Sequence, residues 1–244
     1  MKILAFDTSS RSGSVALLDD GNLVREITAA DAHTHALWLM PAIRDLLDGC
    51  GLDVSSVGLF ALTVGPGSFT GLRIGVSTAK GLAWPLHRKV MAVSTLESLA
   101  LNLRFSGMTV CPMLDARKGE VYTALYRFSG KKMEAVLRDT LMAPKDLFAL
   151  LSSGDAPTGQ VAFLGNGAAV YKKEIEGAVK DAHIVPEPLW HIRASNVALI
   201  AYEGLLSGRT PLSPSELLPV YLRKSEAEIK GKAPPPPPSG QKAS

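Results

Sequence analysis

Residues 65–83 read GPGSFTGLRIGVSTAKGLA, a glycine-rich turn that runs into a helix with further glycines. The hydroxyl of Ser68 or Thr70 can cap the first turn of this helix, because it can accept from free backbone N–H groups. Glycine inside a helix costs about 1 kcal/mol relative to alanine, so its repeated use needs a structural reason. Three small residues are four positions apart and therefore line one face: Gly71, Gly75 and Ala79. A face without side chains predicts that another backbone lies close to it, from this chain or from a partner.

The segments on both sides of this helix follow one order of elements, and that order occurs twice. In the first half we expect strands at 3–7, 14–18, 23–28, 57–64 and 89–93, and helices at 35–50, within 65–83 and at 95–104. In the second half we expect strands at 109–115, 121–128, 133–138, 161–164 and 183–185, and helices at 144–151, 168–175 and 194–206. Each half reads βββαβαβα. The sequence therefore predicts a duplicated α/β fold of two lobes, residues 1–104 and 105–223.

Composition limits the partners and the compartment of the protein. The chain has 244 residues, and 26 basic against 23 acidic side chains give a net charge of +3. That charge is too small for a protein that grips nucleic acid by its own field. The two cysteines, Cys50 and Cys111, indicate small core residues in a reducing compartment. The first apolar run stops at Asp7, too early for a secretion signal, so we expect a cytoplasmic protein without a membrane span.

The last part of the sequence differs from the rest in composition. Residues 224–244 contain five successive prolines at 234–238, set among lysine, glycine and serine. Such a segment cannot bury enough apolar surface to order itself. We expect a disordered proline-rich tail, with a recruitment motif in extended conformation as the alternative.

The duplicated order of elements resembles the actin, sugar-kinase and Hsp70 ATPase (ASKHA) superfamily. In that superfamily a phosphate loop follows the first strand of each half, and glycines that contact adenosine lie between a strand and a helix. The residues at these places are Asp7, Thr8, Asp115, Arg117, Gly165 and Gly167. The resemblance therefore implies a nucleotide site in the cleft, either working or vestigial.

Short segments carry a closer resemblance, which covers about residues 1–223. They read ILAFDTS at 3–9, GPGSFTGLRIG at 65–75, DAR at 115–117 with EVY at 120–122, and PVYLR at 219–223. On these segments the chain resembles the bacterial TsaB family, also called YeaZ. The resemblance implies a non-catalytic subunit, an inactive paralogue of the transferase TsaD, that acts in forming threonylcarbamoyladenosine in tRNA. It also implies pairing with TsaD, which has the same fold, and with the ATPase TsaE.

An active ASKHA-type ATPase or small-molecule kinase is the alternative function. A phosphate loop of this superfamily usually has glycine after its aspartate, so that backbone N–H groups can approach the phosphates. Thr8 and Ala116 occupy those two places here. We therefore expect no resident cofactor, with weak binding of ATP, ADP or another anion left open.

No metal site is expected either. The resemblance implies that TsaD holds its metal with two histidines spaced His-x-x-x-His and a later aspartate. The nearest candidates here are His33 and His35, which are two residues apart. Side chains with that spacing diverge by about 200° on a helix. We expect these histidines to be ordinary surface or capping residues.

The two long helices of the first half are the predicted partner surface. Apolar residues surround more of helix 35–50 than the single stripe of about 100° that a surface helix needs, which fits either a core helix or one covered by a partner. In the glycine-bearing helix, the small residues are expected to form a bare ridge for a partner. The predicted partner-binding residues are Leu37, Trp38, Ala42, Gly71, Leu72, Gly75, Val76 and Ala79. The expected partners are a TsaD-like transferase, a TsaE-like ATPase and, without the transferase, a second copy of the chain, with tRNA reached only through the complex.

Overall fold

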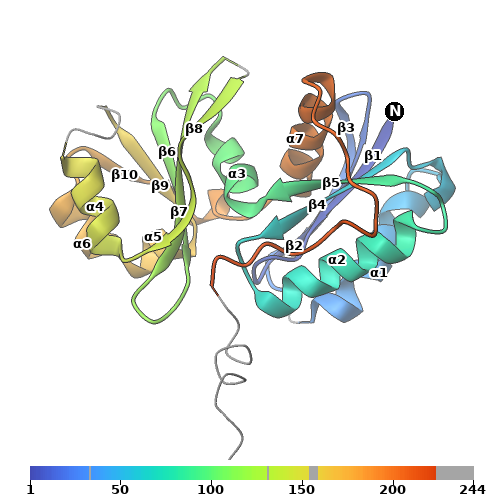
Figure 1. Cartoon of the computed structure of the whole chain (residues 1–244), viewed down its shortest axis with the longest axis horizontal. Coiled ribbons are helices and arrows are strands. Elements are labelled where there is room, and N and C mark those ends of the chain that lie inside the picture. Colours follow the sequence, from blue (N-terminus) through green and yellow to red (C-terminus); the bar gives the residue numbers. More distant parts are fainter. Residues whose placement is uncertain (33, 131, 154–158, 224–244) are drawn as a thin grey trace, which may run out of the picture.

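The computed structural model describes residues 1–32, 34–130, 132–153 and 159–223 and shows two lobes, each built on one twisted sheet (Figure 1). His33 and the proline-rich tail, 224–244, lie outside the described residues. The predictions made for them stay predictions.

The first lobe contains a five-stranded sheet. Its strands are β1 (Lys2–Asp7), β2 (Gly13–Asp19), β3 (Asn22–Ala29), β4 (Leu59–Gly65) and β5 (Lys89–Ser94), in the order β3-β2-β1-β4-β5. The first three strands are antiparallel, and β1, β4 and β5 are parallel. Asp20 and Gly21 join β2 to β3 with positive φ angles, as the hairpin requires.

The second lobe repeats this sheet. Its strands are β6 (Thr109–Asp115), β7 (Val121–Ser129), β8 (Lys132–Met142), β9 (Val161–Leu164) and β10 (Ala182–Ile184), in the order β10-β9-β6-β7-β8. The strand directions match as well, because β6, β7 and β8 are antiparallel while β6, β9 and β10 are parallel. The predicted duplication and the ASKHA-type architecture are confirmed.

The helices follow the predicted order with one difference. They are α1 (His35–Asp48), α2 (Phe69–Ala83), α3 (Thr95–Ala100), α4 (Pro144–Ser152), α5 (Asn166–Val170), α6 (Lys172–Ala178) and α7 (Ala194–Leu206), with short 3₁₀ turns at Val54–Ser56, Leu101–Leu103 and Glu187–Leu189. The single helix expected at 168–175 is in fact two helices. Tyr171, at φ −106° and ψ 24°, leaves the helical region and separates α5 from α6.

Helices cover both faces of the first sheet, which explains why β1 is apolar without interruption. Leu4 and Phe6 of β1 belong to a core with α1 and α2. Ile3 and Ala5 point to the opposite face and belong to a core with α7. α7, which comes from the second half, thus completes the first lobe (Figure 1).

α3, the last helix of the first half, likewise packs against the sheet of the other lobe. Leu96, Leu99 and Ala100 of α3 share a core with Val110 of β6 and Ala162 of β9. Each half of the chain therefore supplies its final helix to the packing of the other half. The two lobes are joined by shared cores, although each keeps its own sheet.

The segment 207–223 returns to the first lobe and runs beside β4 and α2 (Figure 1). Val90 and Leu212 exchange backbone hydrogen bonds of 3.0 and 2.8 Å, and the N–H of Val220 donates to the carbonyl of Val64 at 2.7 Å. Leu217 is fully buried in the core beneath α1 and α2. We call this segment the C-terminal strap.

Candidate functional site

The glycine-rich turn after β4 holds the loop that follows β1. Ser68 is the cap of α2, and its Oγ accepts from the N–H of Gly71 at 3.2 Å, so Ser68 rather than Thr70 fills the predicted role. The N–H of Ser68 in turn donates to the carbonyl of Ser9 at 2.7 Å. The start of α2 and the loop after β1 are therefore one packed unit.

The small-residue face of α2 lies against this same loop. A Cβ atom added at Gly71 would lie 1.9 Å from the carbonyl oxygen of Thr8, and one at Gly75 would lie 2.7 Å from the Thr8 hydroxyl. The Thr8 hydroxyl donates to the carbonyl of Gly71 at 2.7 Å. The close backbone that the sequence predicted comes from this chain.

The expected bare ridge for a partner is therefore wrong. The helix turns its small face inward because only glycine leaves room for Thr8. Six of the predicted partner-binding residues are buried within the chain: Ala42, Gly71, Leu72, Gly75, Val76 and Ala79. Other side chains of α1 and α2 form the exposed surface of these two helices.

The outer face of α1 does carry exposed apolar residues. Leu37 is 75% exposed and Met40 is 46% exposed, while Leu39 and Ile43 are buried against the sheet. Trp38 is half-buried, and its indole lies so close to Gly13 that a Cβ there would approach within 2.7 Å. Met40 is one of the apolar residues expected around this helix but is not among the predicted partner-binding residues, although its three-residue spacing from Leu37 puts both on one side.

A second surface feature joins α2 to the C-terminal strap. The rings of Phe69 and Tyr221 stack with centroids 4.3 Å apart. The guanidinium of Arg73 lies 4.0 Å from the centre of the Phe69 ring, and its Nε donates to the Tyr221 hydroxyl at 3.1 Å. Both segments stand out in the sequence, but their contact could not be predicted because 148 residues separate Arg73 from Tyr221.

In the first predicted phosphate loop, Asp7 and Thr8 are both buried. Asp7 is fully buried, and its Oδ1 accepts from the N–H of Ser9 at 3.1 Å, from the Ser9 hydroxyl at 2.6 Å and from the Thr63 hydroxyl at 2.5 Å. Burial raises the pKa of Asp7, and these donors and the nearby His35 oppose the rise. The Oδ2 atom has no hydrogen-bond partner among the described residues. Asp7 and Thr8 are thus bonded to Thr63 and Gly71 inside the first lobe.

The second predicted phosphate loop is a tight hairpin at the end of β6. The N–H of Arg117 donates to Asp115 Oδ1 at 2.9 Å, and both Arg117 and Lys118 adopt positive φ angles. Gly165 and Gly167 pack on the end of β6, where added Cβ atoms would lie 2.4 and 2.9 Å from the carbonyl of Met113. The structure therefore brings Asp115, Arg117 and Gly167 together in one lobe.

The C-terminal strap reaches this hairpin. Arg223 Nη1 donates to the carbonyl of Ala116 at 2.6 Å, and Nη2 contacts the carboxylate of Glu120. The PVYLR segment therefore touches both the glycine-rich turn of the first lobe, through Val220, and the hairpin of the second.

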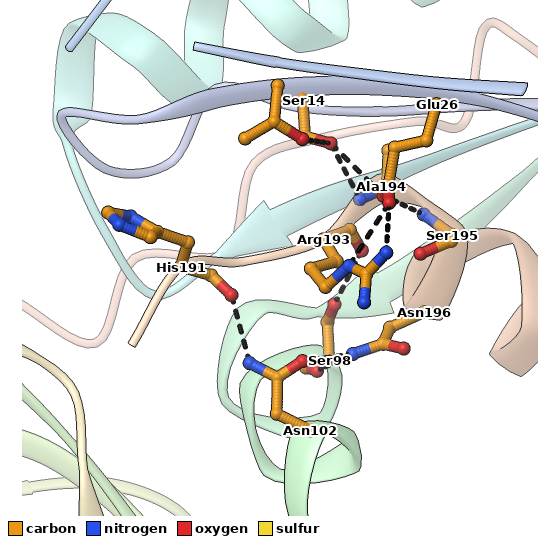
Figure 2. A network of polar contacts seen from close by, with 10 residues as sticks. Ser14, Glu26, Ser98, Asn102, His191, Arg193, Ala194, Ser195 and Asn196 are labelled. Atoms are coloured by element: carbon orange, nitrogen blue, oxygen red, sulfur yellow. Dashed lines mark hydrogen bonds and ion pairs between the residues drawn. The ribbon is translucent and has the colours of Figure 1, made fainter. Parts of the chain in front are cut away.

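Polar contacts also hold α7 to the first lobe (Figure 2). Glu26 of β3 accepts from the N–H of Ser195 at 2.9 Å and from Arg193 at 2.5 Å. The hydroxyl of Ser14 accepts from the N–H of Ala194 at 3.0 Å. A carboxylate at a helix N-terminus is stabilised by the free N–H groups and by the helix dipole. Glu26 therefore fixes where α7 begins.

Comparison with known proteins shows the family. A family model described as "TsaD: tRNA N6-adenosine threonylcarbamoyltransferase" matches residues 23–231. The tRNA threonylcarbamoyladenosine biosynthesis protein TsaB of Bacillus subtilis (strain 168) is 35% identical over 231 residues, which cover 94% of this chain and 97% of that protein. The chain belongs to the TsaB family. The resemblance found in the sequence is confirmed, and the family is related to the TsaD transferases.

Other TsaB-family proteins agree with this result. The protein of the same name from Escherichia coli (strain K12) is 37% identical over 150 residues, which cover 58% of this chain and 64% of that protein. The solved structure of YeaZ from Pseudomonas aeruginosa has a TM-score of 0.77 at 31% identity and covers 91% of this chain and 99% of its own. The fold and the family name therefore agree.

Two features are absent from the described residues. In the described part of the chain, no helix has both the length and the apolar character that crossing a bilayer demands. Over the same residues, no three histidine, cysteine, aspartate or glutamate side chains gather in a way that could hold a metal ion.

Proposed function

We propose that this chain is a non-catalytic accessory subunit for forming N6-threonylcarbamoyladenosine in tRNA. It scaffolds a TsaD-like transferase and allows a TsaE-like ATPase to be recruited to the assembled pair. Family membership supports the pathway. The observation that carries the scaffold role is the outer face of α1, where Leu37 and Met40 leave apolar surface uncovered.

The packing of the first lobe supports a role without catalysis. A kinase or ATPase of this fold needs its first aspartate to face a nucleotide and its metal ion. Asp7 is fully buried and is bonded to Ser9 and Thr63, and Thr8 fills the space beside Gly71. Calorimetric titration of the isolated chain with ATP and Mg²⁺ tests the competing enzyme: micromolar binding with turnover would favour catalysis over scaffolding.

If the outer face of α1 binds the transferase, negative charge placed on that face should disrupt the pairing of the two proteins. Replacing both Leu37 and Met40 by glutamate should weaken affinity for a TsaD-like transferase about tenfold or more, because apolar anchors dominate protein interfaces. Modification of tRNA in a reconstituted system should fall in parallel. Leu206→Glu on α7 is the matched control, since Leu206 is 73% exposed and Leu37 is 75% exposed. Unchanged affinity of the double variant would show that the transferase docks elsewhere.

Without the transferase, we propose that the same face of α1 pairs two copies of the chain. The apolar surface is then covered by its own equivalent around a two-fold axis. Sedimentation of the purified chain measures this association, which the Leu37→Glu, Met40→Glu double variant should reduce and Leu206→Glu should leave intact. The TsaE-like ATPase is expected to bind the assembled pair, and pull-downs with and without the transferase distinguish this from direct binding.

A further inference from the structure

A hollow of about 270 Å³ lies where α2 ends and β5 begins. Trp84, His87, Arg88 and Lys89 form one wall, and residues 213–215 of the C-terminal strap form the other. The second wall is fixed in place, because Leu212 is hydrogen-bonded to Val90 at the start of β5. We call this hollow the Trp84 pocket.

Trp84 lines the pocket with a largely exposed side chain. Trp84 caps the C-terminal end of α2, and it is 59% exposed. Burying a tryptophan side chain removes about 150–250 Å² of its surface from water. At Trp84 most of that surface stays exposed. An exposed aromatic face of this size is suited to stacking against a flat ligand.

The same wall carries positive charge. His87, Arg88 and Lys89 are consecutive and exposed, and the turn is held by a bond from the N–H of Arg88 to the carbonyl of Ala83 at 2.9 Å. Glu216 is the opposing acidic residue, and its carboxylate is engaged by the N–H and hydroxyl of Ser213. Arg88, whose Nη2 donates to the carbonyl of Ser55 at 3.4 Å, and Lys89 together outweigh Glu216.

A role confined to helix stability does not account for the whole pocket. Basic side chains near a helix C-terminus do offset the helix dipole, and Lys80 is already in the last turn of α2 for that purpose. The dipole gives no reason for an exposed indole between the helix end and the basic turn. An aromatic side chain beside two cations is instead the combination with which proteins bind single-stranded nucleic acids.

We propose that the Trp84 pocket binds one nucleotide unit of single-stranded RNA, with the base stacked on Trp84 and a phosphate held by Arg88 and Lys89. The proposal rests on the proposed function, in which the modified substrate is an RNA. The volume of about 270 Å³ lies just below the usual range for sites of whole small molecules, so it suits a single base. The small net charge of the chain means that this contact is weak alone and adds to others in the complex.

Fluorescence anisotropy of a labelled single-stranded RNA of about eight nucleotides, titrated with the full chain, tests the proposal. Trp84→Ala should weaken binding by about 5- to 150-fold, and Trp84→Phe should restore most of it, since both aromatics stack. Replacing Arg88 and Lys89 by glutamine should reduce the salt slope of log affinity by about 0.7, the value for one single-strand phosphate. Phe105→Ala is the matched control, because Phe105 is an exposed aromatic residue elsewhere.

Three results would overturn the assignment: equal losses in Trp84→Ala and Phe105→Ala, free AMP competing as strongly per mole as the RNA, or an acidic peptide displacing the RNA more strongly than unlabelled RNA does. Pairing with the transferase separates this proposal from the scaffold role. Trp84→Ala should keep full pairing, whereas the Leu37→Glu, Met40→Glu double variant should keep RNA binding by the isolated chain. If the unmutated chain failed to bind RNA but still paired with the transferase, this proposal would be wrong and the scaffold role would stand.

Discussion

Replacing Gly71 by alanine would place a methyl group against the loop that follows β1. The new Cβ would lie 1.9 Å from the carbonyl oxygen of Thr8, a backbone atom that no rotamer change can move away. Ordinary contact begins near 3.4 Å, so the loop or the helix must shift by about 1.5 Å. Such a shift strains the bonds from Ser68 to Ser9 and from Thr8 to Gly71.

The size of the effect follows from these contacts. Overpacking of this kind costs about 1–3 kcal/mol. Each weakened hydrogen bond contributes about 1 kcal/mol, and the helix propensity of alanine returns at most about 1 kcal/mol. We therefore expect Gly71→Ala to lower the free energy of unfolding by about 2–4 kcal/mol, with a fall in Tm of about 4–16 °C for a chain of this size.

Gly81 provides the matched control within the same helix. A Cβ added at Gly81 meets no atom within 4 Å, so Gly81→Ala should stabilise the chain by about 0.5–1 kcal/mol through propensity alone. Urea unfolding followed by circular dichroism measures both variants on one scale. If Gly71→Ala proves as stable as Gly81→Ala, the loop after β1 does not pack on α2 as described, and the inward orientation of the small face is wrong.

Two further predictions concern the contacts that hold α7 to β3 and the response to pH. Glu26→Ala should lower the free energy of unfolding by about 2–4 kcal/mol in the same assay, because it removes a charged partner of Ser195 and Arg193, while Glu26→Gln keeps one acceptor and should lose less. Burial raises the pKa of Glu97, so the native state holds a proton that the unfolded state releases, and stability should fall as the pH rises from the ordinary glutamate value through the raised one. Glu97→Gln should flatten that part of the stability profile, whereas the same change at the exposed Glu134 should leave it unaltered.

Local signals in the sequence were enough to predict the fold. Periodicity placed the strands and helices of both halves, and Ser68 was one of two predicted caps because its position follows a tight turn. The break at Tyr171 was missed, since no glycine or proline marks it. The crossing of α3 and α7 between the sheets was also missed, because alternation predicts that both sheet faces are covered and not which helix covers them.

The candidate site was harder to predict because its decisive contacts are distant in sequence. The hydrogen bond between Thr8 and Gly71 spans 63 residues, and the ion pair between Glu26 and Arg193 spans 167. A pattern of small residues shows that something lies close, but it does not say whether that is the same chain or another. The side that faces solvent, with Leu37 and Met40, was only partly identified for the same reason.

Glycines at equivalent positions of the two lobes indicate the structural role of the glycine-rich turn. Gly65 and Gly165 close the equivalent strands β4 and β9, and both have positive φ. Each lobe then brings further glycines against the end of its first strand, Gly71 at Thr8 and Gly167 at Met113. In both lobes, close packing of glycine therefore holds the end of the first strand and the loop that follows it in place. Since these backbones are occupied by one another, the contacts that we propose with the transferase and with RNA are made by side chains that point outward from α1 and from the end of α2.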